Sequence, residues 1–382
     1  MFRSSFRLPI TLLGIPVKID LSFLLVLPLF AWLIGSQIPG YVALFQRMGL
    51  DIEPTPLQRG LTPYWLGLLA ALGLFGSVLI HELGHAITAR LFGVTTKEIT
   101  LWFLGGVASF DEVPEQRGAE ALVALAGPLT SMLLALLFWW LWQNVATAAS
   151  TVFILSYLTI TNVGLALFNL LPALPLDGGR LLRSLLALGL PRLEATRISV
   201  GISQIIAILM GIYGFLTLNI FLLAIAFFVY SAGQAENRYA LMTQAFKNLK
   251  VSDLMTREVI SVPPEMWLSQ FRKLIFFKKH TGYPVVENGD PIGFVKPRDA
   301  ENADEDATVA SIMRDPETIS ADDTAMEALH RIGQSELGRL VVTDSGGRMV
   351  GIVSKTDLIR ILQDNLTVGK PVGGDHQRPW DS

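Results

Sequence analysis

The chain has 382 residues, of which 51% are hydrophobic and only 16% are charged, a balance far from that of an ordinary soluble domain. Its formal net charge of -3 argues against nucleic acid as a partner, because no basic tract is available to neutralise phosphates. The chain has no cysteine. Disulfides, thiolate metal sites and cysteine nucleophiles are therefore excluded, and any metal must be held by carboxylates and by the five histidines.

Long uncharged stretches predict an α-helical polytopic membrane protein with about six transmembrane helices, because about 20 apolar residues cross the hydrocarbon core. Residues 21–46 and 60–80 each supply one span. Residues 121–176 are too long for a single span and suit two. Residues 198–235 fit another pair, with Asn219 near the turn.

The distribution of cations predicts which side of the membrane the termini occupy. An even number of spans places both ends on one side, and short cytoplasmic flanks carry an excess of Lys and Arg. The side opposite the N-terminus has only Arg47 and Arg59. The flanks on the N-terminal side carry Arg3, Arg7, Lys18, Arg90, Lys97, Arg117, Arg180, Arg183, Arg192 and Arg197. We therefore expect a multi-pass protein of the cell (inner) membrane, with its N-terminus and C-terminal domain in the cytoplasm.

A metal-binding motif follows the second predicted span. His81-Glu82-Leu83-Gly84-His85 is an H-E-x-x-H sequence, which on a helix places both imidazoles on one face with the glutamate beside them. Two neutral imidazoles and a third ligand leave zinc an open position for water, and the carboxylate can take the proton of that water. A chance match is the ordinary alternative for so short a motif. Ionisable residues at membrane depth, however, are costly unless they have a function.

The topology predicts Asp177 as the third ligand. It ends the uncharged stretch 121–176, so two crossings return it to the side on which His81 and His85 lie. The two prolines Pro172 and Pro175 break the preceding helix and allow irregular backbone that lines a cavity. The alternative is that Asp177-Gly178-Gly179 forms only a turn or a helix cap at the membrane surface.

Three motifs in order resemble those of the site-2 protease family of intramembrane metalloproteases. They are His81-Glu82-Leu83-Gly84-His85, Asn169-Leu170-Leu171-Pro172 and Leu176-Asp177-Gly178. The resemblance implies that His81, His85 and Asp177 bind one Zn²⁺ ion and that Glu82 is the general base. It also implies that Asn169 donates to the developing oxyanion. The alternative for Asn169 is an interhelical hydrogen bond.

Two glycine-containing segments also resemble family patterns. Leu104-Gly105-Gly106-Val107-Ala108-Ser109-Phe110 is expected to form an extended edge that binds the substrate by strand addition, with Gly105, Gly106 and Val107 in contact with it. The alternative is an ordinary re-entrant loop. Ala126-Gly127-Pro128 is interpreted as close helix packing and a kink.

From about residue 250 the composition becomes that of a soluble α/β domain with an internal repeat. Gly293-Phe294-Val295 followed by Asp299 recurs as Gly351-Ile352-Val353 followed by Asp357. Val251 with Met255 recurs likewise as Val309 with Met313. The predicted domains are residues 1–240 for the intramembrane metalloprotease, 249–308 and 309–365 for the two repeats, and 366–382 for a disordered tail.

The two repeats resemble a tandem pair of CBS domains. That resemblance implies that an adenine nucleotide, ATP or AMP, binds in the cleft between them as a regulator. Ser354 and Asp357 match the family's hydroxyl and ribose-binding carboxylate, whereas the first repeat has Lys296 before Asp299 and lacks the hydroxyl. A purely structural role, such as formation of a homodimer, is the alternative.

The sequence thus predicts an intramembrane zinc endopeptidase of site-2 protease type. Its expected substrates are the transmembrane segments of single-pass membrane proteins, as in regulated intramembrane proteolysis, with modulation by a nucleotide at the CBS domains. The alternative is a nucleotide-regulated membrane protein that binds metal or transports ions without protease activity. The two hypotheses differ at Glu82, which a simple binding site does not need as a base.

Overall fold

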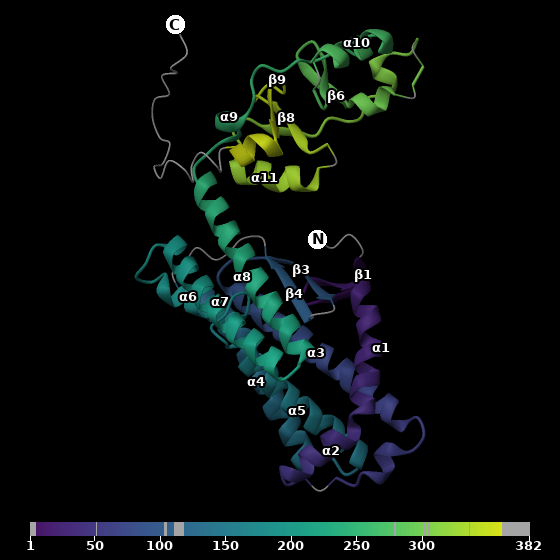
Figure 1. The fold of residues 1–382 in the computed structure, drawn as a ribbon, viewed down its shortest axis with the longest axis vertical. Coiled ribbons are helices and arrows are strands. Elements are labelled where there is room, and N and C mark those ends of the chain that lie inside the picture. Colours follow the sequence, from purple (N-terminus) through teal and green to yellow (C-terminus); the bar gives the residue numbers. More distant parts are fainter. Residues whose placement is uncertain are drawn as a thin grey trace. The chain divides into compact units, whose positions relative to one another are not determined.

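The computed structural model describes residues 5–50, 52–102, 105–110, 118–278, 280–301, 303–304, 306–335 and 337–360. They belong to two compact units, Met1–Arg238 and Tyr239–Ser382 (Figure 1). Leu104 and the predicted tail 366–382 lie outside the described residues. The first unit is a helical bundle with a small sheet, and the second consists of short helices and strands.

The sheet of the first unit has the strand order β1, β2, β3, β4, with bounds Ser5–Leu12, Ile15–Asp20, Thr96–Trp102 and Gly105–Phe110. The pair β1/β2 is antiparallel, β2/β3 is parallel and β3/β4 is antiparallel. Leu13 and Gly14, both with positive φ, join the first hairpin in the two-residue turn that matches strand twist. In the sequence this segment is interpreted only as a charged flank, and the hairpin is not predicted. The extended conformation expected for residues 105–110 is present, and β4 has a single partner among the described strands.

The helices of the first unit form a bundle in which α3 contacts α1, α4 and α5 (Figure 1). Their bounds are α1 Leu21–Ser36, α2 Ile38–Arg47, α3 Thr62–Leu91, α4 Ala119–Asn144, α5 Ala149–Asn169, α6 Asp177–Leu186, α7 Arg192–Leu216 and α8 Ile220–Phe246, with a short 3-10 turn at Thr55–Gln58. The turn between α7 and α8 falls at Leu218 and Asn219, as predicted.

Within the described residues, five helices are long and apolar enough to cross a membrane: α3, α4, α5, α7 and α8. The pair α1 and α2 brings the number to six if it is one span, although the two helices are bent by 57°. Residues 21–46, predicted as one span, therefore form two helices joined at a break. Pro39 in the first turn of α2 contributes to the bend, because proline has no amide hydrogen and cannot donate to the preceding turn. The protein is therefore a multi-pass, mainly helical membrane protein.

Glycines allow α1 and α3 to approach until their backbones touch. A Cβ atom on Gly67 would lie 2.1 Å from the carbonyl oxygen of Ala31, and one on Gly35 would lie 2.8 Å from that of Pro63. Lipid gives apolar helices no hydrophobic reason to associate, so such crossings rely on close van der Waals contact between small residues. This contact fixes α1 on the helix that carries the H-E-x-x-H motif.

The second unit contains two similar halves. The first has α9 Val251–Leu254, α10 Leu268–Lys278, β5 Tyr283–Glu287, β6 Asp290–Val295 and a 3-10 turn Pro297–Ala300; the second has a 3-10 turn Val309–Ser311, β7 Thr318–Ser320, α11 Ala325–Gln334, β8 Arg339–Thr343 and β9 Met349–Ser354. The amide and carbonyl of Phe294 pair with Arg314, and those of Ile352 pair with Thr256, so each half contributes a segment to the other.

This exchange explains the repeated residues seen in the sequence. A Cβ atom on Gly293 would lie 2.6 Å from Sδ of Met313, and one on Gly351 would lie 2.9 Å from Sδ of Met255. Each methionine therefore packs on the glycine of the opposite half. The recurrence of these residue types follows from an approximate twofold arrangement.

Gly67→Ala is expected to destabilise the first unit by about 1–3 kcal/mol, because the new methyl group overlaps a backbone carbonyl of α1 that has no room to move. The measurement is the Tm of the purified protein in detergent. Gly76→Ala in the same helix is the matched control, since a Cβ atom there meets nothing within 4 Å. It should leave the Tm unchanged or raise it, because alanine is the better helix former. Equal effects of the two substitutions would contradict this account of the α1 and α3 contact.

Candidate metal centre

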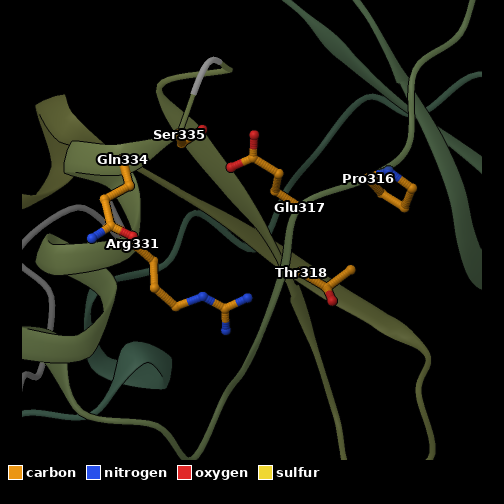
Figure 2. Close-up of a pocket in the computed structure, with 6 residues that line it drawn as sticks. All are labelled: Pro316, Glu317, Thr318, Arg331, Gln334 and Ser335. Atoms are coloured by element: carbon orange, nitrogen blue, oxygen red, sulfur yellow. The ribbon is translucent and has the colours of Figure 1, made fainter. Parts of the chain in front are cut away.

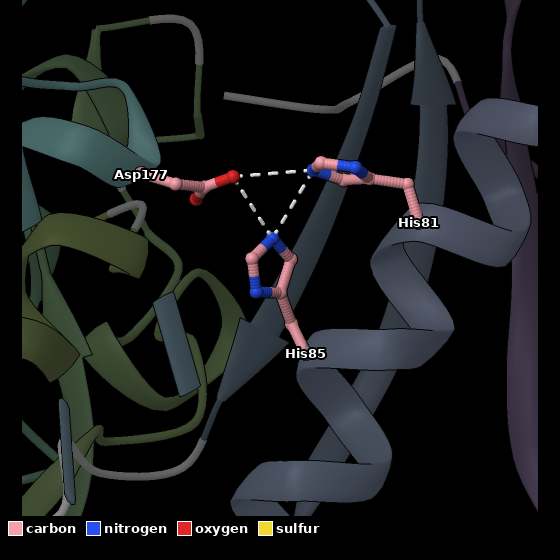
Figure 3. Close-up of side chains that lie close together, drawn as sticks. All are labelled: His81, His85 and Asp177. Carbon is pink, nitrogen blue, oxygen red and sulfur yellow. Dashed lines mark hydrogen bonds and ion pairs between the residues drawn. The ribbon is translucent and has the colours of Figure 1, made fainter. Parts of the chain in front are cut away.

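His81 and His85 lie one turn apart on α3 and are both buried (Figure 3). The i, i+4 spacing places their rings on the same face of the helix. Their Nε2 atoms lie 3.3 Å apart. Such proximity leaves no room for a proton on both atoms, so the pair is suited to hold a cation.

Asp177 reaches the two histidines from α6, far away in the sequence (Figure 3). Its Oδ2 atom lies 3.2 Å from Nε2 of His81 and 3.2 Å from Nε2 of His85. The two glycines that follow it let the start of α6 press on the preceding backbone: a Cβ atom on Gly178 would lie 2.2 Å from the carbonyl oxygen of Leu170. Asp177 is therefore the first residue of a helix, with its side chain directed at the imidazoles and buried.

The second nitrogen of each imidazole is held by α4. Nδ1 of His85 lies 2.7 Å from the carbonyl oxygen of Val123, which can only accept, so Nδ1 carries the proton and donates. Nδ1 of His81 lies 2.8 Å from Oγ of Ser131. In the neutral His85 ring, Nε2 is then a bare lone pair that faces a carboxylate oxygen. Only a proton or a metal cation can bring these atoms together.

The spacing of the three ligand atoms suits zinc. Ligand atoms about 2.0–2.1 Å from a tetrahedral zinc ion are about 3.3 Å apart. The three observed separations are 3.2, 3.2 and 3.3 Å. Two imidazoles and a carboxylate with partners on their outer atoms are also the donor set of many catalytic zinc sites. The residues present therefore fit this ion.

Gly127 makes room for the cluster. A Cβ atom on this residue of α4 would lie 2.2 Å from Nε2 of His85 and 2.6 Å from Nε2 of His81. The sequence singled out Gly127 for helix packing, but its role toward the histidines was missed, as was that of Ser131. The available signal was that Gly127 and Ser131 share a helical face by their i, i+4 spacing.

Glu82, which follows His81 on α3, faces β4. Its Oε2 accepts a hydrogen bond from the amide of Ala108, 3.2 Å away. A Cβ atom on Gly106 would lie 2.6 Å from Cγ of Glu82. Gly105 has a φ of 135°, which glycine tolerates, and lies beside Val78 of α3. The predicted substrate residues Gly105, Gly106 and Val107 thus form a strand against the candidate base.

Asn169 is the last residue of α5, and its side-chain amide donates to the carbonyl oxygen of Leu165 one turn earlier, at 3.0 Å. Its side chain therefore bonds to its own helix. An interhelical bond of the kind considered for Asn169 is made instead by Asn162, whose amide donates to Oγ of Ser77 on α3 at 3.0 Å.

The predicted nucleotide residues occupy equivalent places in the two halves of the second unit. Oδ2 of Asp357 accepts from the amide of Ser354 at 2.8 Å and from its hydroxyl at 2.6 Å. Oδ2 of Asp299 accepts from the amide of Lys296 at 2.9 Å, and its Oδ1 is paired with Arg314 at 2.6 Å. The half with the hydroxyl is therefore the one whose carboxylate has no such ion pair among the described contacts.

The second half also contains a pocket (Figure 2). Its lining consists of Pro316, Glu317, Thr318, Arg331, Gln334 and Ser335. None of the predicted nucleotide residues is among them. The pocket therefore adds nothing to the nucleotide assignment.

An apolar bundle that encloses two histidines and an aspartate in this geometry defines a multi-pass membrane protein with a candidate metal site. The chain matches the family model described as Peptidase family M50 over residues 69–147 and 142–212, and the CBS domain model over 251–305 and 309–364. It belongs to family M50, the site-2 proteases, and is a metalloprotease with a tandem pair of CBS domains.

Two relatives of similar length support this membership. The chain is 32% identical to a zinc metalloprotease of Methanocaldococcus jannaschii over 351 residues, which cover 92% of this chain and 94% of the relative. It is 29% identical to the Rip3 protein of Mycobacterium tuberculosis over 377 residues, 91% of each chain. Among solved structures, a site-2 protease from Methanocaldococcus jannaschii is 30% identical and covers 61% of this chain and 95% of its own, with a TM-score of 0.44.

Gly127→Ala is expected to weaken zinc binding at least tenfold, because its methyl group would occupy the space of both Nε2 atoms. The measurement is zinc affinity by chelator competition on the purified full chain. Gly164→Ala in α5 is the matched control, since a Cβ atom there meets nothing within 4 Å. Retention of the wild-type affinity by Gly127→Ala would contradict a metal site between these imidazoles.

Proposed function

We propose that the protein is an intramembrane zinc endopeptidase that cleaves transmembrane segments of single-pass membrane proteins. In this proposal His81, His85 and Asp177 hold the zinc ion and Glu82 is the general base. The observation that carries it is the triangle of two Nε2 atoms and one carboxylate oxygen, at 3.2 to 3.3 Å, with Glu82 next in the chain to His81.

Zinc bound to these residues would lower the pKa of a water molecule and polarise the scissile carbonyl. Glu82 takes the proton from the attacking water and returns it to the nitrogen of the leaving amine. Ser131 and the carbonyl of Val123 hold the outer nitrogens of the imidazoles, which fixes the orientation of both rings. Asn169 supplies an amide donor to the developing oxyanion with the second of its two N–H groups, while the first bonds to the carbonyl oxygen of Leu165.

The substrate is proposed to bind along β4. A helical substrate hides its carbonyls in its own hydrogen bonds, and pairing with a strand would hold it in an extended form that water can attack. Two observations support this position. β4 has one partner among the described strands, and the Ala108 amide already reaches the carboxylate of Glu82. A peptide that pairs with Gly105, Gly106 and Val107 therefore passes beside the base.

The proposed location is the inner membrane of the cell, with the N-terminus and the CBS domains in the cytoplasm. The excess of Lys and Arg on the flanks of the N-terminal side supports this orientation. The active site is then closer to the cytoplasmic end of α3, because the histidines lie in its second half.

A nucleotide, ATP or AMP, is proposed to bind the CBS pair and to modulate proteolysis, with Ser354, Asp357 and Asp299 as contact residues. The Ser354 hydroxyl donates to Oδ2 of Asp357 at 2.6 Å, and the oxygens of this pair are acceptors for the hydroxyl groups of a ribose. In the other half, Arg314 pairs with Asp299 and competes for the same carboxylate. We therefore assign the stronger site to the half that contains Asp357. Association of two chains through their CBS domains also belongs to this proposal.

Glu82→Gln is expected to reduce proteolysis about 10²–10⁴-fold, the usual contribution of a general base, without loss of zinc. The measurement is cleavage of a panel of single-pass membrane proteins in proteoliposomes, with zinc content determined on the same samples. Glu98→Gln on β3 is the control, because Glu98 pairs with Lys18 and not with the metal-ligating cluster. Unchanged proteolysis by Glu82→Gln would exclude Glu82 as the general base, whereas absence of cleavage by the wild-type protein would favour a protein that binds metal or transports ions.

Ser354→Ala is expected to weaken nucleotide binding about fivefold, which corresponds to one hydrogen bond of about 1 kcal/mol. The measurement is titration calorimetry with ATP and with AMP on the full chain. Ser311→Ala is the matched control in the same unit, because the Ser311 hydroxyl bonds only locally to the Thr308 carbonyl at 2.7 Å. Equal affinity in wild type and Ser354→Ala would exclude Ser354 as a contact residue, and absence of nucleotide binding to the wild type would argue for a structural role of the CBS pair.

A further inference from the structure

Arg183 is a buried cation that the proposed chemistry does not use. It lies in the last turn of α6, and its side chain is only 10% exposed. The sequence placed it among the cytoplasmic flank charges, but the structure turns it inward. Its Nε donates to Oε1 of Glu120 on α4 at 3.0 Å, and its Nη1 donates to Oε2 of Glu236 on α8 at 3.0 Å. We call these three residues the charge cluster.

The charge cluster is balanced by a fourth residue. Arg192, at the start of α7, reaches Oε2 of Glu120 at 3.4 Å and is 55% exposed, so two cations face two carboxylates. Burial lowers the pKa of Arg183, but the charges of Glu120 and Glu236 raise it by more, so that the pKa lies above its ordinary value. Separating a buried guanidinium from either of its two carboxylates is costly, because the separation leaves a buried charge without a partner. The cluster therefore resists relative movement of α4, α6 and α8.

Two of these helices supply parts of the metal site. α6 begins at Asp177, six residues before Arg183, which is about 9 Å along the helix. On α4, Glu120 lies one turn before Val123, whose carbonyl holds His85. A movement of α6 relative to α4 would thus change the distance between the Asp177 oxygen and the imidazole of His85.

The third helix continues into the C-terminal unit. Glu236 belongs to α8, which ends at Phe246. Phe246 is buried with Val251, Leu254 and Ile319 in a hydrophobic core of that unit. The covalent path from the CBS domains to the metal site therefore passes the residue that pairs with Arg183.

We propose that Arg183 is a positioning residue for Asp177 and that its pair with Glu236 couples the position of α8 to the affinity of the metal site. The inference rests on the proposed zinc site. Coupling between two sites is reciprocal. A ligand or a movement that displaces α8 therefore weakens zinc binding, and removal of zinc in turn loosens α8 near Glu236.

The first experiment measures zinc affinity by chelator competition on the full chain in detergent. Arg183→Gln is expected to weaken binding at least tenfold, and Arg183→Lys less, because a lysine keeps the charge but loses the fork that spans two carboxylates. Arg192→Gln is the matched control: it removes the same charge from the same partner, Glu120, at an exposed position, and should stay within about twofold of wild type.

The second experiment does not need Arg183 to be altered, so it holds even if Arg183→Gln fails to fold. Hydrogen exchange of α8 is followed in the wild type and in Glu236→Gln, with zinc and after its chelation. In the wild type, chelation is expected to speed exchange around residues 230–240. In Glu236→Gln the exchange there should be fast already and respond less to zinc.

The outcomes separate this inference from the proposed zinc site. Loss of zinc from His81→Ala tests the site itself. If zinc binding depends on His81 but has wild-type affinity in folded Arg183→Gln, the positioning role is wrong. If zinc leaves exchange in wild-type α8 unchanged, the coupling through Glu236 is wrong.

Discussion

The site depends on how closely α4 approaches the face of α3 that carries the two imidazoles. A single missing Cβ, at Gly127, leaves the space in which both Nε2 atoms and the Asp177 oxygen meet. The same helix provides the outer partners of the rings, the carbonyl of Val123 and the hydroxyl of Ser131. One helix contact thus sets the position, the tautomer and the accessible lone pairs of the candidate metal ligands.

Close contacts at glycine recur throughout the membrane unit, for a physical reason. Lipid is as apolar as the helix surfaces, so burial of apolar side chains gives little drive for the helices to associate. Close packing at glycine replaces it. Gly67 lies against the backbone of Ala31, and Gly84 lies against the side chain of Thr130, where a Cβ atom would be 2.3 Å from Oγ1. These contacts hold α3 from two sides. The two histidines and Asp177 are therefore enclosed by closely packed helices, and even a small change in side-chain volume would displace these helices.

In the C-terminal unit, the approximate twofold relation between the two halves places equivalent residues in equivalent positions. Each half lends a segment to the sheet of the other, and the methionine of one half packs on the glycine of its partner. The two carboxylates are nevertheless in different surroundings, because Asp299 faces Arg314 and Asp357 faces a serine hydroxyl. Two halves with the same backbone geometry and different side chains can provide two related ligand sites of unequal affinity.

Local features of the sequence were sufficient for the membrane class, the H-E-x-x-H helix, the return of Asp177 to the same side and the repeat of the second unit. Each depends on residue type, spacing or the length of an uncharged stretch, which neighbouring residues along the chain encode. Only the tertiary structure decided that one Asp177 oxygen reaches both imidazoles, that β4 meets Glu82, that Gly127 opens the site and that Arg183 is buried. These features depend on the distance of closest approach between segments far apart in the chain. That distance is set by small residues on both partners, and no periodicity within either segment specifies it.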